Sequence, residues 1–199
     1  MSSTTEICNL ALSHLGIGKE IASLTDGSEE AAACNRFYAI SLRIVLADFA
    51  WPFATRFVEL GLVEEDPTSE WSYSYRYPSD ALMVRRVLSG ARTDSRDSRV
   101  PYKIASDATG LLIYTDYEDA EVEYTADVTD ANSFPDDFAE ALSYRMAASM
   151  AARVTGGDPF GLGAKAEAKY KERVAASAST SFNEEQPDKT VESEFILGR

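Results

Sequence analysis

The chain has 199 residues, of which 45% are hydrophobic, and a formal net charge of −14. This size and apolar content predict one globular domain, or one domain with a substantial insertion, and exclude a disordered chain. The acidic excess argues against a protein that grips nucleic-acid phosphates or anionic lipid, and no apolar run approaches the roughly 20 residues of a membrane span. The start MSSTTEICN lacks the basic and apolar parts of a signal peptide, so we expect a cytosol-like compartment at first.

The first predicted helix is TEICNLALSHL, with Thr4 or Thr5 as its cap and Gly16 as its left-handed stop. We expect it to pair antiparallel with the long helix that follows. His14, the only histidine, lies in its last turn, where a capping or surface position suits the helix dipole. Of the two cysteines, Cys8 falls on this helix and the other on the next. With no metal-ligand spacing, both are predicted to be core residues.

The segment from Ser28 to Trp51 predicts one long helix, capped by Ser28 and stopped by Pro52. At about 100° per residue its polar side chains form two stripes. One consists of Glu29, Arg36 and Arg43, and the other of Glu30, Ser41 and Asp48. Between them lie a narrow apolar face (Ala33, Phe37, Ile40, Ile44, Trp51) and a broad one (Cys34, Tyr38, Leu42, Val45, Phe49).

A helix with two apolar faces needs two partners, and two interpretations stay open. The helix is either the centre of its own bundle, or it packs one face within the chain and the other against a second copy. In the second case the charged stripes border a subunit interface. That interface would comprise Glu29, Arg36, Phe37, Ile40, Arg43, Ile44 and Asp48.

Residues 53–133 have the composition of a β region, with short alternating runs rich in Tyr, Val and Thr. TRFVELGLV reads as one strand, and the acidic cluster Glu64, Glu65, Asp66 after it as a solvated loop. WSYSYRYP places four aromatic rings on one strand face, which indicates a core face; a platform that stacks single-stranded nucleic acid is disfavoured by the charge. Further strands are ALMVRRVLS, VPYKIAS, GLLIYTDY and AEVEYTADV. Their short connections predict mainly antiparallel pairing.

Helices return over residues 134–180, beginning at Ser133 or Asp136 and rich in alanines that let neighbouring backbones approach. The predicted fold class is therefore α+β. A helical bundle is formed by residues 1–52 and 134–180, with a β insertion subdomain at 53–133. Residues 181–199 form a polar, acidic arm that ends in Phe195, Ile196, Leu197, Gly198 and Arg199. The arm is either a docking peptide or a frayed tail.

The sequence offers little sign of catalysis. GGDPFGLGAK has Leu162 where a phosphate-binding loop has its lysine, so we reject a nucleotide site. Asp127, Asp130 and Asn132 lack the spacing of a calcium loop. Asp136 and Asp137 lie at a helix start, where negative charge is favourable for the helix itself. We expect no enzyme activity, no cofactor and no metal.

The chain contains, in this order over nearly its whole length, NLALSHLG, IASL, AAACNRFY, ADFAWPFAT, YRYPSDAL, FAEALSYRMAASMA and the C-terminal arm. Together these segments resemble podovirus tail tubular protein A and related phage head-to-tail adaptors. The resemblance implies a homo-oligomeric ring, a dodecamer in the relatives. Such a ring is held beneath the portal protein and above the tail nozzle protein in the virion, after assembly in the host cytoplasm. Viral DNA passes through it without specific binding.

On this interpretation Phe195, Ile196, Leu197 and Arg199 of the arm contact the portal protein, and no membrane or cofactor is involved. The acidic composition suits a channel to which DNA does not adhere. Two other classes of protein remain as alternatives. One is a peptidoglycan-cleaving tail enzyme that uses paired carboxylates, and the other is a bacterial oligomeric scaffold unrelated to phage.

Overall fold

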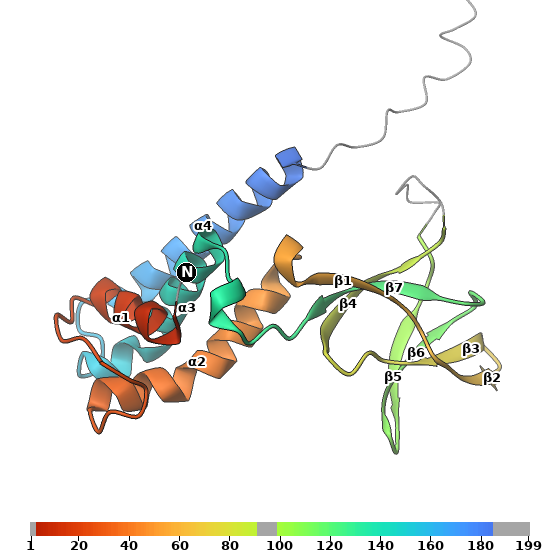
Figure 1. The fold of residues 1–199 in the computed structure, drawn as a ribbon, viewed down its shortest axis with the longest axis horizontal. Helices are drawn as coiled ribbons and strands as arrows, with labels where there is room; N and C mark the ends of the chain where they lie inside the picture. The colour runs from red at the N-terminus through yellow and green to blue at the C-terminus, as the bar shows by residue number, and fades with distance from the viewer. Residues whose placement is uncertain (1–2, 91–98, 185–199) are drawn as a thin grey trace, which may run out of the picture.

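The computed structural model describes residues 3–90 and 99–184, which form a helical bundle and a β subdomain side by side (Figure 1). The helices are α1 (Thr4–His14), α2 (Glu29–Asp48), α3 (Asp136–Val154) and α4 (Leu162–Glu184). All seven strands of the described part lie between α2 and α3 in sequence. The predicted α+β class, a bundle of N- and C-terminal helices with a β insertion, is confirmed.

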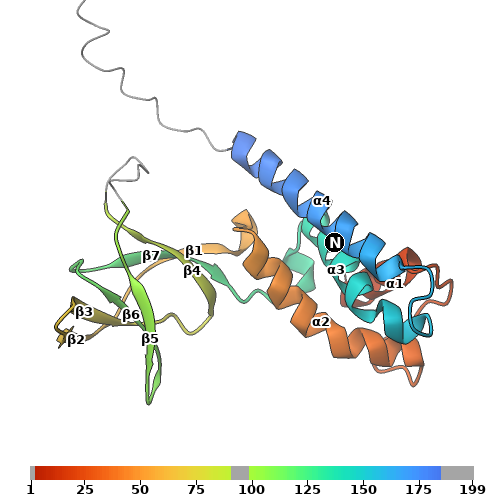
Figure 2. The ribbon, with the colours of Figure 1, turned by 180° about the vertical axis from the view of Figure 1, so that it is seen from behind.

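Helix α3 is the centre of the bundle, because α1, α2 and α4 all pack against it. Its small side chains are buried on several sides: Ala141, Ser143 and Ala147 are each 0% exposed. Three helices can therefore approach its backbone closely. The prediction that α1 pairs with α2 is wrong, since α1 packs mainly on α3. Helix α4 runs along the outside of the bundle, and its C-terminal end projects past the other helices (Figures 1 and 2).

Helix α1 begins with a capping box one residue before the predicted caps. The Ser3 hydroxyl accepts a hydrogen bond from the Glu6 backbone N–H at 3.1 Å, and the Glu6 carboxylate accepts one from the Ser3 N–H at 2.6 Å. Two of the N–H groups left open at the helix start are thereby satisfied. The predicted stop is confirmed, because Gly16 has a φ of 74°. After it, the Asn9 side chain exchanges two hydrogen bonds with the Ile21 backbone and holds the following loop against α1.

The β subdomain consists of two antiparallel sheets with the strand orders β1-β7-β4 and β2-β3-β6-β5. The strands are β1 (Thr55–Glu59), β2 (Leu62–Thr68), β3 (Trp71–Arg76), β4 (Ala81–Leu88), β5 (Lys103–Asp107), β6 (Gly110–Thr115) and β7 (Glu121–Ala126). The predicted antiparallel pairing is confirmed. The chain passes from the first sheet to the second at Leu60 and Gly61, so the run predicted as one strand is two.

The acidic cluster predicted as a loop lies instead within β2. Glu64 and Glu65 are exposed and pair with β3 through two register shifts, and Asp66 has a φ of 49°. Strand β2 is at an edge of its sheet, where charged residues and Pro67 are tolerated because one row of backbone groups faces water. The solvation of these carboxylates was predicted correctly, but the backbone conformation was not.

Each region has its own hydrophobic core. Among the described residues, the bundle core contains 26 buried residues, whereas the core between the two sheets contains eight: Tyr75, Val84, Val87, Ile113, Ala120, Val122, Tyr124 and Ala126. Of the aromatic strand face, Tyr75 is 2% exposed, and Tyr73 and Tyr77 pack partly against this core. The core interpretation of that face is confirmed. No helix in the described residues is long and apolar enough to cross a membrane.

Candidate interaction surface

Helix α2 carries most of the residues predicted to form a subunit interface, and its ends fix how it is presented. The predicted cap is confirmed, since the Ser28 hydroxyl accepts a hydrogen bond from the backbone N–H of Ala31 at 3.2 Å. Glu29 and Glu30 follow in the first turn, at the positive end of the helix dipole.

The helix ends at Asp48 and not at Trp51 as predicted. Phe49 already has an extended backbone, with φ −139° and ψ 151°. The Trp51 indole folds back and donates a hydrogen bond to the carbonyl oxygen of Val45 at 2.8 Å, and the side chain is 1% exposed. Trp51 therefore belongs to the bundle core rather than to the narrow apolar face of the helix.

Arg85 of β4 closes the C-terminal end of α2. Its Nη2 donates to the carbonyl oxygens of Ala47 and Phe49 at 2.9 Å and of Leu46 at 3.2 Å, while its Nε donates to the Thr125 hydroxyl at 2.8 Å. A positive charge at this end complements the helix dipole, and the carbonyl groups that α2 leaves open gain donors. Burial lowers the pKa of the Arg85 guanidinium. One side chain thus joins the bundle to the β subdomain.

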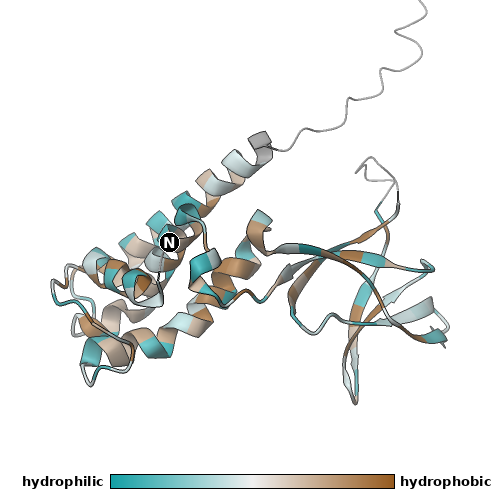
Figure 3. Cartoon of the chain, in the orientation of Figure 1, coloured by the Kyte–Doolittle hydropathy of each residue, from teal (hydrophilic) through white to brown (hydrophobic). Residues whose placement is uncertain are grey.

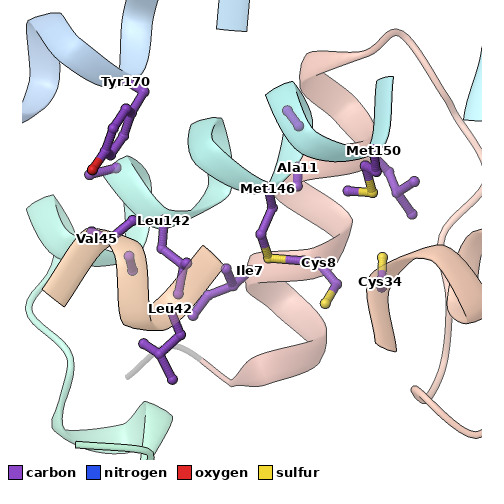
Figure 4. Close-up of a cluster of buried hydrophobic side chains, with 14 of the residues drawn as sticks. Ile7, Cys8, Ala11, Cys34, Leu42, Val45, Leu142, Met146, Met150 and Tyr170 are labelled. Carbon is purple, nitrogen blue, oxygen red and sulfur yellow. The ribbon is translucent and has the colours of Figure 1, made fainter. Parts of the chain in front are cut away.

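Most of the broad apolar face of α2 is buried, as predicted, while Tyr38 and Phe49 are half-buried against the bundle core. Cys34, Leu42, Val45 and Leu46 are each at most 3% exposed, and Figure 4 shows Leu42 and Val45 in the cluster with Leu142 of α3. This face is therefore part of the bundle core and is not available to a second protein.

The second polar stripe of α2 is used within the chain. Ser41 is 1% exposed, and the Glu30 carboxylate forms an ion pair with Lys19 at 2.9 Å. Asp48 accepts a hydrogen bond from the Tyr170 hydroxyl of α4 at 2.6 Å. Burial and the neighbouring Asp48 raise the pKa of Tyr170. Asp48, one of the predicted interface residues, thus connects α2 to α4.

The remaining face of α2 is open to solvent. We call it the α2 strip and define it as Arg36, Phe37, Ile40, Arg43 and Ile44. Ile40 is 60% exposed, Arg36 and Arg43 are exposed, and Phe37 and Ile44 are half-buried at its border. Glu29 is exposed at the N-terminal end of the same line. Figure 3 shows hydrophobic colouring over the C-terminal part of α2, where the strip ends.

Arg43 is also tied to the β subdomain. Its Nη2 lies 2.8 Å from the Asp127 carboxylate, just after β7, and the Asp127 N–H donates to the Asp80 carbonyl oxygen at 2.7 Å. The Asp80 carboxylate accepts a hydrogen bond from the Tyr124 hydroxyl and lies 3.6 Å from Arg56. Exposed ion pairs contribute at most about 1 kcal/mol to stability. This row of exposed contacts therefore adds to the link that Arg85 makes between the two regions and does not replace it. Ile40 and Arg36 are the members of the strip that project freely.

The carboxyl pKa shifts in the described residues all run in one direction. Where the pKa of a carboxyl group is shifted, it is lowered, by the Ser3 backbone at Glu6, by Lys19 at Glu30, by Arg76 at Asp107 and by Lys169 at Glu172. A general acid needs the opposite shift. No group of three or more His, Cys, Asp or Glu side chains in residues 3–90 and 99–184 could hold a metal ion.

The glycine-rich segment before α4 is a helix cap. The Asp158 carboxylate accepts hydrogen bonds from the backbone N–H groups of Leu162 at 2.7 Å and Gly163 at 2.9 Å. The chain's own carboxylate therefore occupies the position at the helix start where a phosphate would bind. This geometry agrees with the rejection of a nucleotide site.

His14 is half-buried, and its ring packs on α3 rather than lying free at the surface as predicted. Its Nε2 lies 3.0 Å from the Ser143 hydroxyl, and its ring stacks on Tyr144 with centroids 3.8 Å apart. Burial lowers the pKa of the imidazole, and the charge of Glu140 opposes that shift. His14 thus forms part of the contact between α1 and α3.

Sequence reasoning missed the exposed apolar residues of the β subdomain and the role of Arg85. Phe57 is 56% exposed on edge strand β1, and Leu62 is 51% exposed at the start of edge strand β2. The signal for Arg85 was an arginine inside the apolar run ALMVRRVLS, which is costly in a sheet unless the charge has partners. The predicted portal-contacting residues Phe195, Ile196, Leu197 and Arg199 lie outside the described residues.

Comparison with known proteins adds no relative: no family model matches the chain, and no curated protein matches it significantly.

Proposed function

We propose that this protein is a structural subunit of a phage head-to-tail adaptor ring, placed between a portal protein and a tail nozzle protein. The α2 strip contacts a neighbouring copy in the ring, and viral DNA passes through the channel. The protein is not an enzyme in this proposal. The observation that carries it is Ile40, a large aliphatic side chain that is 60% exposed on a helix whose other apolar face packs into the bundle core.

The chemistry of the strip supports a contact between copies of one chain. Arg36 lies beside Ile40 in a protein whose net charge is −14, so its positive charge can meet acidic surface on a neighbouring copy, whereas Arg43 is already paired with Asp127. An apolar centre with charged residues around it is the usual arrangement of a protein interface. Contacts between different surfaces of identical subunits close into a ring when the rotation permits.

The acidic composition supports the proposal that DNA passes through the ring without binding to it. DNA carries a dense row of phosphates, and a surface of like charge does not hold it. The exposed carboxylates of β2, Glu64 and Glu65, are an example of such a surface. The resemblance of the chain to tail tubular protein A, stated above from its segments, supports the portal and nozzle as partners, with the arm of residues 181–199 on the portal.

The test measures the mass of the particles that the protein forms, first by itself and then after mixing with purified portal rings. We expect Ile40→Asp to abolish assembly while the variant stays folded, because a carboxylate would be desolvated at the centre of the interface. Leu10→Asp is the matched control: Leu10 is an exposed aliphatic residue of α1, at 41%, away from the strip. Truncation after Ser193 should separately abolish binding to the portal ring and leave contacts between copies intact.

Two results would count against the proposal. If Ile40→Asp assembled as the Leu10→Asp control does, the strip would not be the subunit interface. If the intact wild-type chain bound neither portal rings nor a second copy, the adaptor function itself would be wrong. Clearing of cell-wall substrate that one Asp or Glu substitution abolished would favour the peptidoglycan-cleaving alternative instead.

A further inference from the structure

The two cysteines meet in the bundle core. Cys8 of α1 and Cys34 of α2 are both 0% exposed, and both have free thiols. Their thiol groups are in hydrogen-bonding contact, and Figure 4 shows the two sulfur atoms directed into the space between α1 and α2. Since both helices pack mainly on α3, this pair is a direct bridge between two elements that otherwise touch little.

We propose that Cys8 and Cys34 form a redox-sensitive pair that a small-molecule disulfide converts into a covalent link between α1 and α2. The Cys34 thiolate attacks one sulfur of glutathione disulfide, which releases one glutathione and leaves a mixed disulfide on Cys34. The Cys8 thiol then loses its proton, attacks the Cys34 sulfur and releases the second glutathione. Two electrons pass from the protein dithiol to the reagent, and the two thiol protons end on the two glutathione molecules.

The geometry and the chemistry of the pair set this order. The Cys8 thiol donates to the Cys34 sulfur, which lowers the pKa of Cys34, while the same bond and burial raise the pKa of Cys8. Cys34 is therefore the better source of thiolate. The two sulfur atoms must approach to about 2 Å for the disulfide bond to form.

Burial controls the rate of the reaction. Because neither sulfur is exposed in the native state, the reagent reaches Cys34 when α1 opens locally. Once formed, the link closes a long loop of the unfolded chain and stabilises the bundle. In a phage adaptor, the dithiol would persist during assembly in a reducing cytosol and the disulfide would form in the released particle. That consequence rests on the proposed function, but the cross-link does not.

The experiment uses the purified full-length chain without portal protein, so its outcome is independent of the adaptor proposal. Native protein is incubated with glutathione disulfide, and its free thiols are counted after denaturation. We expect both thiols to disappear, the intact mass to fall by two hydrogens, and a peptide pair containing Cys8 and Cys34 to separate on reduction. The midpoint of thermal unfolding should rise by about 5–10 °C relative to the reduced protein.

The single variants Cys8→Ala and Cys34→Ala are the controls, because each keeps one thiol and should show no rise in the midpoint on oxidation. If either variant failed to fold, the thiol count and mass of the wild-type protein would still decide. The proposal is overturned if the native wild-type chain keeps two thiols, or gains only glutathione adducts, under conditions that cross-link the urea-unfolded chain.

Discussion

The helical bundle and the β subdomain differ in how completely they bury their apolar side chains. The bundle core has 26 buried residues and includes Trp51 and Phe138, whereas the β core has eight. Of the eleven large apolar residues that are exposed in the described part of the chain, eight lie in or beside the strands: Phe57, Val58, Leu62, Val63, Met83, Ile104, Leu111 and Tyr117.

This difference indicates different sources of stability. The bundle closes its core around α3 with its own helices, so we expect it to stay folded without help. A small two-sheet core with apolar residues at its edges gains less from burial and depends more on its neighbours. In this chain the β subdomain has α2 as its neighbour, and the hydrogen bonds of Arg85 attach it to the end of that helix.

The largest expected effect is in the bundle core. Phe138 of α3 is 0% exposed and meets the rings of Trp51, Phe53 and Phe134 with centroids 4.8 to 4.9 Å apart. Phe138→Ala removes these contacts and leaves a cavity, so we expect the free energy of unfolding to fall by about 3–5 kcal/mol. Urea unfolding followed by far-UV circular dichroism measures it.

Phe160→Ala is the matched control for that substitution. Phe160 lies in the segment between α3 and α4 and is 75% exposed, so the same change of side chain should alter stability by about 0.5 kcal/mol or less. Equal losses at the two positions would show that the bundle core is not the main source of stability.

An intermediate effect is expected at the junction. Arg85→Ala removes the donor to three carbonyl groups of α2, at a cost of about 1–3 kcal/mol, and should let the two regions unfold separately. Hydrogen exchange should then show β1, β4 and β7 losing protection before α3. Arg85→Lys keeps the charge but not the planar set of donors, so its free energy of unfolding should lie between those of the wild type and Arg85→Ala.

Arg56→Ala separates this local role from a general effect of removing charge. Arg56 lies in β1 of the β subdomain, and its ion pair with Asp80 is 3.6 Å long and exposed to solvent. Its loss should cost less than about 1 kcal/mol and leave unfolding cooperative. If Arg56→Ala uncoupled the regions and Arg85→Ala did not, the row of exposed ion pairs would be the true connection.

The two regions also differ in how well the sequence predicted them. In the bundle, the start of the long helix, its cap at Ser28 and most of its buried broad face follow from periodicity and capping chemistry, which act locally, whereas its end at Asp48 does not. Which helix occupies the centre does not follow from them. Alanines such as Ala141 and Ala147 have little hydrophobicity per residue, and their importance depends on three neighbours that come from distant parts of the chain.

The strands were identified from their alternation, but their boundaries and edges were not. The run TRFVELGLV looks like one strand because only the pairing of Leu60 with Ala120, and of Gly61 with Arg76, divides it between two sheets. The role of Arg85 was hidden for the same reason, since its partners lie 36 or more positions away in the sequence. Of the predicted interface, the strip containing Ile40 is exposed, whereas Asp48 is occupied by Tyr170, a residue of a different helix.

The smallest expected effect comes from His14 and concerns pH. Burial lowers the pKa of this imidazole below its ordinary value of 6.5, so the folded state binds the proton less well than the unfolded state. The stability that neutral His14 contributes is therefore complete above pH 6.5 and is lost as the pH falls below that value. The loss should be less than about 1 kcal/mol, because the side chain is only partly buried and solvent screens the charge.

Because His14 is the only histidine, the comparison of wild type with His14→Gln isolates its contribution from that of the many carboxyl groups. The difference in free energy of unfolding between the two proteins should shrink as the pH is lowered, and NMR titration should place the native pKa below 6.5. Glu140→Gln sharpens the test: removing the carboxylate that favours the charged imidazole should lower the pKa of His14 further. A native pKa at or above the ordinary value would mean that α1 does not pack on α3 closely enough to exclude water, and the central position of α3 would then be in question.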